Sequence, residues 1–381
     1  MYNDMNTPMQ RNSETLAKSS NIVKINQNQI KWSWATRLLH GNHEYEISKE
    51  EEYNEMPVVG DLGLFRVTRI GSHTRIINTD SRKFRIYEGD LFVGIFGNRY
   101  ATDAFEAEVE GLKDLSLLTT AGMVGRIKSS HNSIHRFTEV SFLGFLKDKK
   151  SNQKVNLKQT IFKTRLFENY LSKPKGPGNL LVIVGSGMNS GKTTVCRKLV
   201  KSFSQKGLSV AACKLTGSIS PRDSDEMVSA SATCVTDFSD YGFPSTYKCE
   251  EKELLDLFEI MLEDTEKFNP DITIMEIADG VLQQETHFLL TEPSFQKKVK
   301  GVVVAADSAP SALYTVNHVE NLGYKVIALS GAITSSPLYM KEFENMSTIP
   351  VISSANDTIR FGSLFNNLLK KKENIRHSLV E

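Results

Sequence analysis

Ten consecutive residues, Gly185 to Thr194, carry the strongest chemical signal in this sequence and read GSGMNSGKTT. They follow the apolar run LLVIV (180–184) and open a stretch with helical periodicity that ends near Gly207. Glycines allow several backbone N–H groups to turn toward an anion, and a helix N-terminus adds partial positive charge. A strand, such a loop and a helix in this order predict a binding loop for the phosphates of a nucleotide.

Within this loop, Lys192 is expected to reach the β- and γ-phosphates and the Thr193 hydroxyl to bind Mg²⁺. The loop sequence departs from the common motif G-x-x-x-x-G-K-T. Ser186 stands where the first glycine of that motif is expected, and Gly185 lies one position earlier. The predicted nucleotide-binding residues are Gly185, Gly187, Asn189, Ser190, Gly191, Lys192, Thr193 and Thr194.

Charged residues at the ends of two later apolar runs complete the predicted site. Phosphoryl transfer needs cations on the phosphates and carboxylates on the metal. We therefore predict Lys192, Lys214 and Glu276 as catalytic residues, and Thr193, Asp225 and Glu276 as the Mg²⁺ site. Glu276 is the firmer choice, because a carboxylate in an apolar strand is rarely buried without a partner.

Two of these assignments have simpler alternatives. Lys214 could be a solvent-facing lysine at a strand end, and Asp225 could cap the helix predicted by DEMVSASA. Asp223 also competes with Asp225 for the metal.

The nonapeptide GSGMNSGKT resembles the phosphate loop of dethiobiotin synthetases, written G-T-D-T-x-V-G-K-T, with the same offset between the first glycine and the Gly-Lys-Thr. The segment CKLTGSISPRDSDEM (213–227) is similar to that family's lysine-ended second strand and metal aspartate, and Glu276 in IMEIADG falls on the glutamate of its E-G-A-G-G motif. The resemblance covers residues 180–355 and implies Mg²⁺-ATP chemistry, with Lys214, Asp225 and Glu276 in the roles given above.

The elements around these residues indicate two different architectures. After Gly178, near-continuous apolar runs alternate with amphipathic helical stretches, which is typical of a doubly wound, mostly parallel sheet in an α/β P-loop NTPase domain. From Pro57 to Phe145, short alternating runs broken by Gly-Asp pairs predict a small β-barrel or sandwich. We expect a disordered tail (1–30), a β-rich domain (31–171), a linker (172–179) and the P-loop domain (180–381).

Composition excludes several broad classes. The 46 basic and 45 acidic side chains give a net charge of +1, so no overall field recruits nucleic acid or an anionic membrane. The apolar runs are too short to span a bilayer, and we expect a cytoplasmic protein that does not bind membranes. Between 60 and 100, basic residues outnumber acidic ones and alternate with aromatic residues. Single-stranded nucleic acid could use such a face, although aromatic side chains at strand spacing favour a core. These aromatic residues are Phe65, Phe84, Tyr87, Phe92 and Phe96.

Two functions follow from these patterns. The first is an Mg²⁺-ATP-dependent enzyme, a P-loop ATPase of ligase-like or kinase-like type, that activates a small acid-type acceptor by phosphoryl transfer. The alternative is an ATP-switched binding protein whose N-terminal domain holds a partner or nucleic acid. ATP is favoured over GTP, because no guanine-reading N-K-x-D motif follows the later strands.

A homodimer through the C-terminal domain is also expected. The long Gly217–Lys248 segment contains apolar residues among polar ones, and such a patch usually marks an interface. These apolar residues are Val228, Phe238, Tyr241 and Phe243.

Overall fold

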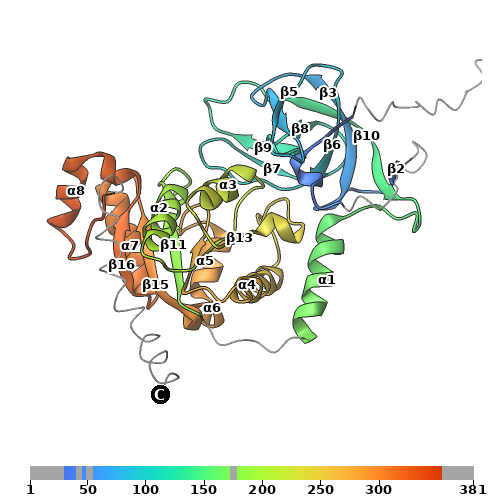
Figure 1. Ribbon diagram of the computed structural model, residues 1–381. Helices are drawn as coiled ribbons and strands as arrows, with labels where there is room; N and C mark the ends of the chain where they lie inside the picture. The colour runs from blue at the N-terminus through green and yellow to red at the C-terminus, as the bar shows by residue number, and fades with distance from the viewer. Residues whose placement is uncertain (1–29, 40–44, 49–54, 172–177, 354–381) are drawn as a thin grey trace, which may run out of the picture.

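The computed structural model describes residues 30–39, 45–48, 55–171 and 178–353. The predicted tail lies outside the described residues except for Ile30, and so does most of the predicted linker. Two separate sheets account for most strands, with the first formed by residues before 149 and the second by residues after 179 (Figure 1).

The N-terminal sheet contains a closed ring of strands. β6 (Leu91–Phe96) pairs with β3 (Leu62–Arg69), β3 with β10 (Glu139–Asp148), β10 with β8 (Leu115–Leu117), β8 with β9 (Met123–Ser130), and β9 with β6. A sheet that closes on itself leaves no free edge within the ring. We call the described residues between 30 and 148 the barrel. Its other strands are β1 (Ile30–Trp32), β2 (Tyr45–Ile47), β4 (Arg75–Ile77), β5 (Lys83–Arg85) and β7 (Phe105–Glu108).

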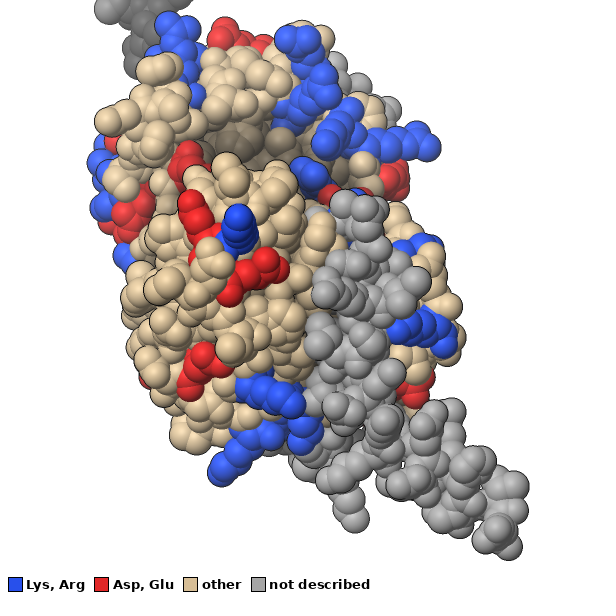
Figure 2. All heavy atoms as spheres, turned by 90° about the vertical axis from the view of Figure 1, so that its left-hand side faces the viewer, with Lys and Arg blue, Asp and Glu red and all other residues tan. Residues whose placement is uncertain are grey.

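Alternation along the strands explains the barrel core. In β3, Leu62 and Leu64 belong to one buried cluster, while Phe65 and Val67 belong to another. Among the interleaved aromatic residues Phe65, Phe92 and Phe96 are buried, whereas Phe84 and Tyr87 are exposed. On the face drawn in Figure 2, Lys and Arg side chains gather over the barrel at the top.

The C-terminal sheet is parallel throughout and has the order β13-β12-β14-β11-β15-β16. This confirms the predicted doubly wound parallel sheet. The strands are β11 (Leu180–Gly185), β12 (Val210–Lys214), β13 (Cys234–Asp237), β14 (Ile272–Glu276), β15 (Val299–Ala305) and β16 (Val326–Ser330). The helices are α2 (Lys192–Gln205), α3 (Pro221–Ser229), α4 (Glu251–Glu266), α5 (Gln284–Thr291), α6 (Pro293–Lys298), α7 (Ala309–Asn321) and α8 (Pro337–Glu344).

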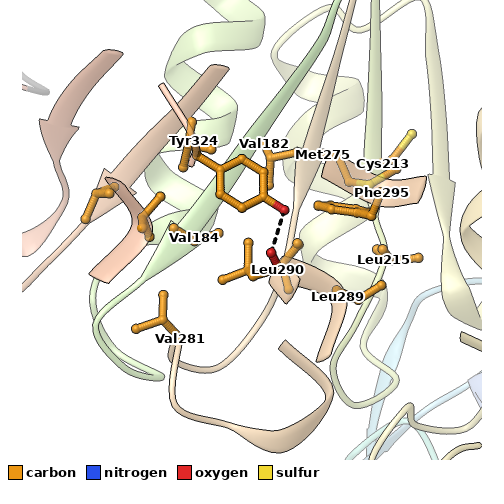
Figure 3. Close-up of a cluster of buried hydrophobic side chains, with 14 of the residues drawn as sticks. Val182, Val184, Cys213, Leu215, Met275, Val281, Leu289, Leu290, Phe295 and Tyr324 are labelled. Carbon is orange, nitrogen blue, oxygen red and sulfur yellow. Dashed lines mark hydrogen bonds between the residues drawn. The ribbon is translucent and has the colours of Figure 1, made fainter. Parts of the chain in front are cut away.

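Both faces of this sheet are buried because its strands are apolar at nearly every position. Val182 and Val184 of β11 pack into one cluster, and Leu181 and Ile183 pack into the other, beside α2. Figure 3 shows the first cluster, in which the Tyr324 hydroxyl donates to the backbone O of Leu290 at 2.9 Å. Burying the hydroxyl with a partner avoids the cost of an unpaired polar group.

One part of the predicted β-rich span is a helix, α1 (Leu157–Leu171). Phe162 and Leu166 are four residues apart and pack on the same core cluster, which is the sequence signal for this helix. The Phe162 ring packs on Phe243 with centroids 4.9 Å apart, so α1 packs against the C-terminal part of the chain.

The long Gly217–Lys248 segment is not a loose insertion. It contains α3, β13 and the short helix η4 (Phe238–Tyr241). Phe238, Tyr241 and Phe243 are buried within the chain, and only Val228 is exposed. The surface patch expected from these residues is therefore absent, and the homodimer stays a prediction without that support.

None of the helices in the described ranges is both long and apolar enough to cross a membrane.

Candidate functional site

The predicted phosphate loop joins β11 to α2, and glycine is required at two of its positions. Gly191 has φ +91°, a conformation that L side chains rarely adopt, and a Cβ there would lie 3.0 Å from the backbone N of Ala332. A Cβ on Gly185 would lie 2.9 Å from Lys192 Nζ. At Gly187 the space that a Cβ would occupy is open. The loop therefore has a tightly packed base and one open side.

Lys192 lies at the centre of this loop and is 3% exposed. Its Nζ donates to the backbone O of Gly187 at 2.7 Å and to Ser190 Oγ at 3.4 Å. Burial lowers the pKa of Lys192, while Glu276 and Asp279 act in the opposite direction. A buried ammonium group held by neutral oxygens is suited to binding an anionic phosphate.

Thr193 and Glu276 are brought together although 83 positions separate them. The Thr193 hydroxyl donates to Glu276 Oε1 at 3.0 Å. Glu276 is 4% exposed and ends β14, which lies between β11 and β12 in the sheet. These oxygens fit Mg²⁺, which prefers hydroxyl, carboxylate and phosphate oxygens.

Lys214 ends the neighbouring strand β12, in register with both Glu276 and Asp237. Its ammonium group forms an ion pair with Asp223 of α3. Burial alone would lower the pKa of Lys214, but the carboxylates of Glu276, Asp223 and Asp237 outweigh burial and raise it. Lys214 is thus a half-buried, charged member of the site and not a solvent-facing lysine.

The structure does not place Asp225 in this site. Pro221 is the first residue of α3 and Ser220 precedes it, so Asp225 lies inside the helix and caps nothing. Residues two apart on an α-helix point about 200° apart, so only one of Asp223 and Asp225 can face Lys214. Asp223 does so, while Asp225 is exposed. The position of Asp225 gives its predicted metal role no support, and the residue of α3 that reaches the site is Asp223.

A pocket lies beside these charges, lined by the strands β12, β13 and β14 and the helices α2 and α3. Its polar lining residues are Lys214, Asp223, Ser224, Thr236 and Glu276.

Of the other predicted loop residues, Ser190 is buried and its hydroxyl donates to the backbone O of Gly187 at 2.9 Å. Thr194 is half-buried in the first turn of α2. Asn189 is exposed, and its side-chain amide donates to Asp103 of the barrel.

Sequence reasoning missed the residues that approach the loop from elsewhere. Asp279 follows β14, and its carboxylate interacts electrostatically with Lys192, Lys214 and Arg99. Burial raises the pKa of Asp279, and these three cations oppose the effect. Arg99 and Asp103 come from the barrel, far before the loop in the sequence, so no local pattern connects them to it.

No family model and no curated protein sequence matches this chain. Among solved structures it is similar to the signal recognition particle receptor FtsY from Elizabethkingia anophelis in complex with GDP, at 17% identity over 53% of this chain and 68% of that one, with a TM-score of 0.33. It is also similar to the kinase domain of the Escherichia coli tyrosine kinase ETK, at 18% identity over 41% and 68%, with a TM-score of 0.31.

A third similar structure is the 54 kDa signal recognition particle protein from Aeropyrum pernix K1 in complex with GDP. Its identity is 16% over 56% of this chain and 55% of that one, with a TM-score of 0.34. Scores this low do not assign a function to this chain.

Proposed function

We propose that this protein is an Mg²⁺-ATP-dependent enzyme that transfers the γ-phosphoryl group to a small acid-type acceptor. The observation that supports this most directly is the convergence of Lys192, Thr193 and Glu276 at one end of the parallel sheet.

In this proposal each residue has a defined role. Lys192 neutralises the β- and γ-phosphate oxygens, and the open side of the loop at Gly187 admits them. Thr193 and Glu276 would hold Mg²⁺, which would spread the charge of the transferred group. As the acceptor oxygen bonds to the γ-phosphorus, the bond to the bridging oxygen breaks and ADP leaves with the electron pair. We assign to Lys214, which forms an ion pair with Asp223, the stabilisation of the negative charge that develops on the leaving ADP oxygen.

The nucleotide base is proposed from the sequence that follows the later strands. AADSAP (305–310) and ALSGAI (328–333) stand where a guanine-reading motif would be expected after β15 and β16. This supports ATP.

The dethiobiotin synthetase resemblance supports the nucleotide and metal chemistry but not that family's substrate. Ile277 and Asp279 stand where the family's motif has glycines. A backbone without side chains allows a substrate to approach closely, and these two side chains remove that space.

The test compares Lys192→Ala with Lys201→Ala, an exposed lysine on the same helix. Binding of a fluorescent ATP analogue and phosphate release would be measured for both. We expect Lys192→Ala to lower turnover about 10²–10³-fold, because it removes a preorganised positive charge, and Lys201→Ala to behave as wild type. Turnover by Lys192→Ala at the wild-type rate would contradict the proposal, and competition by unlabelled GTP as strong as that by ATP would contradict the choice of base.

The alternative, an ATP-switched binding protein, has one specific observation in its favour. The phosphate loop contacts the barrel directly through Asn189 and Asp103. Hydrolysis stimulated by a macromolecule, with no response to small acids, would favour the switch.

A further inference from the structure

The barrel is docked against the phosphate-loop edge of the C-terminal part through residues 97–108. Asp103 accepts a hydrogen bond from Asn189 of the phosphate loop. In the same segment, Glu106 Oε1 accepts a hydrogen bond from the Tyr247 hydroxyl at 2.6 Å. The segment is therefore fixed beside the nucleotide site.

Arg99 differs from the other basic residues of this part of the barrel. Six of them are exposed, whereas Arg99 is half-buried. The six exposed residues are Arg66, Arg69, Arg75, Arg82, Lys83 and Arg85.

The groups in direct contact with the Arg99 guanidinium are uncharged. Its Nη1 donates to the backbone O of Leu118, and the group lies over the Phe105 ring, 4.4 Å from the centroid. Its backbone pairs with Ala107 in both directions, at 2.8 and 2.9 Å. In the described part of the chain no carboxylate forms an ion pair with it, and Asp279 is the acidic group whose charge acts on it. Burial lowers the pKa of Arg99 to about 10, so the group remains charged at neutral pH.

Asp279 connects this arginine to the phosphate site. It has φ +61°, which is unusual for a residue other than glycine. The next residue, Gly280, lies against the phosphate loop, where a Cβ would be 2.7 Å from the backbone O of Ser186. Asp279 is thus held at the loop, where it interacts with Lys192 and Lys214 from one part of the chain and with Arg99 from the other.

We propose that the acceptor binds at this junction, and that Arg99 of the barrel holds an anionic group of the acceptor, a carboxylate or a phosphate, beside Asp279. The inference rests on the proposed phosphoryl transfer and adds to it the acceptor's charge and the part of the chain that recognises it. A planar guanidinium group binds either anion through two parallel hydrogen bonds. An anion here faces Arg99 at one end and the phosphate site at the other. The barrel is then the acceptor-binding part of the enzyme.

The test uses the full chain with Mg²⁺-ATP and measures ADP formation against two sets of anions. The first contains acetate, succinate and glutamate, and the second contains glycerol 3-phosphate and phosphoserine. We expect one set to stimulate ADP formation by the wild type, which identifies the anion.

Three variants are compared with the best stimulating anion. Arg99→Gln keeps a donor for the Leu118 carbonyl and loses the charge, and we expect it to raise the half-saturating anion concentration about 30-fold. Arg99→Lys, which keeps the charge, should lie between Arg99→Gln and wild type. Arg85→Ala, at an exposed barrel arginine, should match wild type.

Affinity for the fluorescent ATP analogue should stay within about twofold in all three variants, because Arg99 does not line the phosphate loop. A wild-type response of Arg99→Gln would overturn the inference, and so would a wild-type enzyme that hydrolyses ATP but responds to neither set. Failure of the wild type to bind ATP would instead overturn the proposed function, and with it the inference.

Discussion

The two sides of the candidate site are built differently. On the phosphate side, Lys192 and Thr193 are neighbours in sequence, and Glu276 reaches them through adjacent strands of one sheet. On the barrel side, Arg99 and Asp279 are far apart in sequence, and their charges influence each other only because the barrel docks on the phosphate-loop edge. The first side depends on a local motif and the second on packing between two sheets.

The two sides also differ in how their positive charges are balanced. On the phosphate side, Lys214 forms an ion pair with the half-buried Asp223, and the Lys192 ammonium group donates hydrogen bonds to Gly187 and Ser190. Arg99 on the barrel side has no such pair among the described residues. We infer that the phosphate side is organised before ligand binds, whereas the barrel side leaves a positive charge for the ligand to neutralise.

The largest expected effect tests the phosphate side. Glu276→Gln keeps an acceptor for the Thr193 hydroxyl and removes the negative charge from the proposed metal site. We expect turnover to fall about 10²–10³-fold while ATP binding persists. Glu342→Gln, at an exposed residue of α8, is the control, and phosphate release would be measured over a range of Mg²⁺ concentrations. Unchanged hydrolysis would remove Glu276 from the site.

The next largest effect concerns the barrel side and is a dependence of the free energy of unfolding on pH. Burial, with a smaller effect of the Arg99 charge, lowers the pKa of His73 from 6.5 to about 4. Between pH 6.5 and 4 the unfolded chain binds a proton that the folded chain does not, so the free energy of unfolding falls as pH is lowered. We expect His73 to account for a loss of about 2 kcal/mol across this range.

Urea unfolding at a series of pH values would measure this contribution. His73→Gln should reduce the decrease in the free energy of unfolding between pH 6.5 and 4. His135→Gln, at an exposed barrel histidine, should leave that decrease unchanged. Equal pH slopes for wild type and His73→Gln would show that His73 is not shielded by the barrel.

The smallest effect separates two residues on one helix. Asp223→Asn removes the charge that pairs with Lys214, and we expect a decrease in turnover of about tenfold. Asp225→Asn, two residues along α3 and exposed, should leave turnover unchanged. Equal losses in the two variants would mean that α3 is placed wrongly relative to Lys214.

Much of the phosphate side was predictable because its signals are local. The strand, glycine loop and helix around Gly185–Thr194 appear in sequence order, and apolar runs after Gly178 predict the parallel sheet. Even here, the choice between Asp223 and Asp225 depended on where α3 begins. Pro221 at its first position decides that, and the prediction of a helix beginning near Asp225 missed it.

Other errors came from predicting the exposure of side chains from the mixture of apolar and polar residues in a segment. Phe238, Tyr241 and Phe243 were expected in an exposed patch, but they are buried in the core cluster that also contains Phe162 of α1. Period-two alternation placed Phe65, Phe92 and Phe96 in a core, yet the same pattern did not distinguish Phe84 and Tyr87, which are exposed.

The sequence by itself determined the phosphate loop, because glycines, Lys192 and a helix start act within ten residues. It also determined the sheet that carries Glu276, because apolar periodicity is a local property. Only the tertiary structure decided that Arg99 and Asp103 of the barrel lie at the same edge as Asn189 and Asp279. Docking of two sheets depends on the shapes and charges of whole surfaces, and no spacing within either segment records which surfaces will meet.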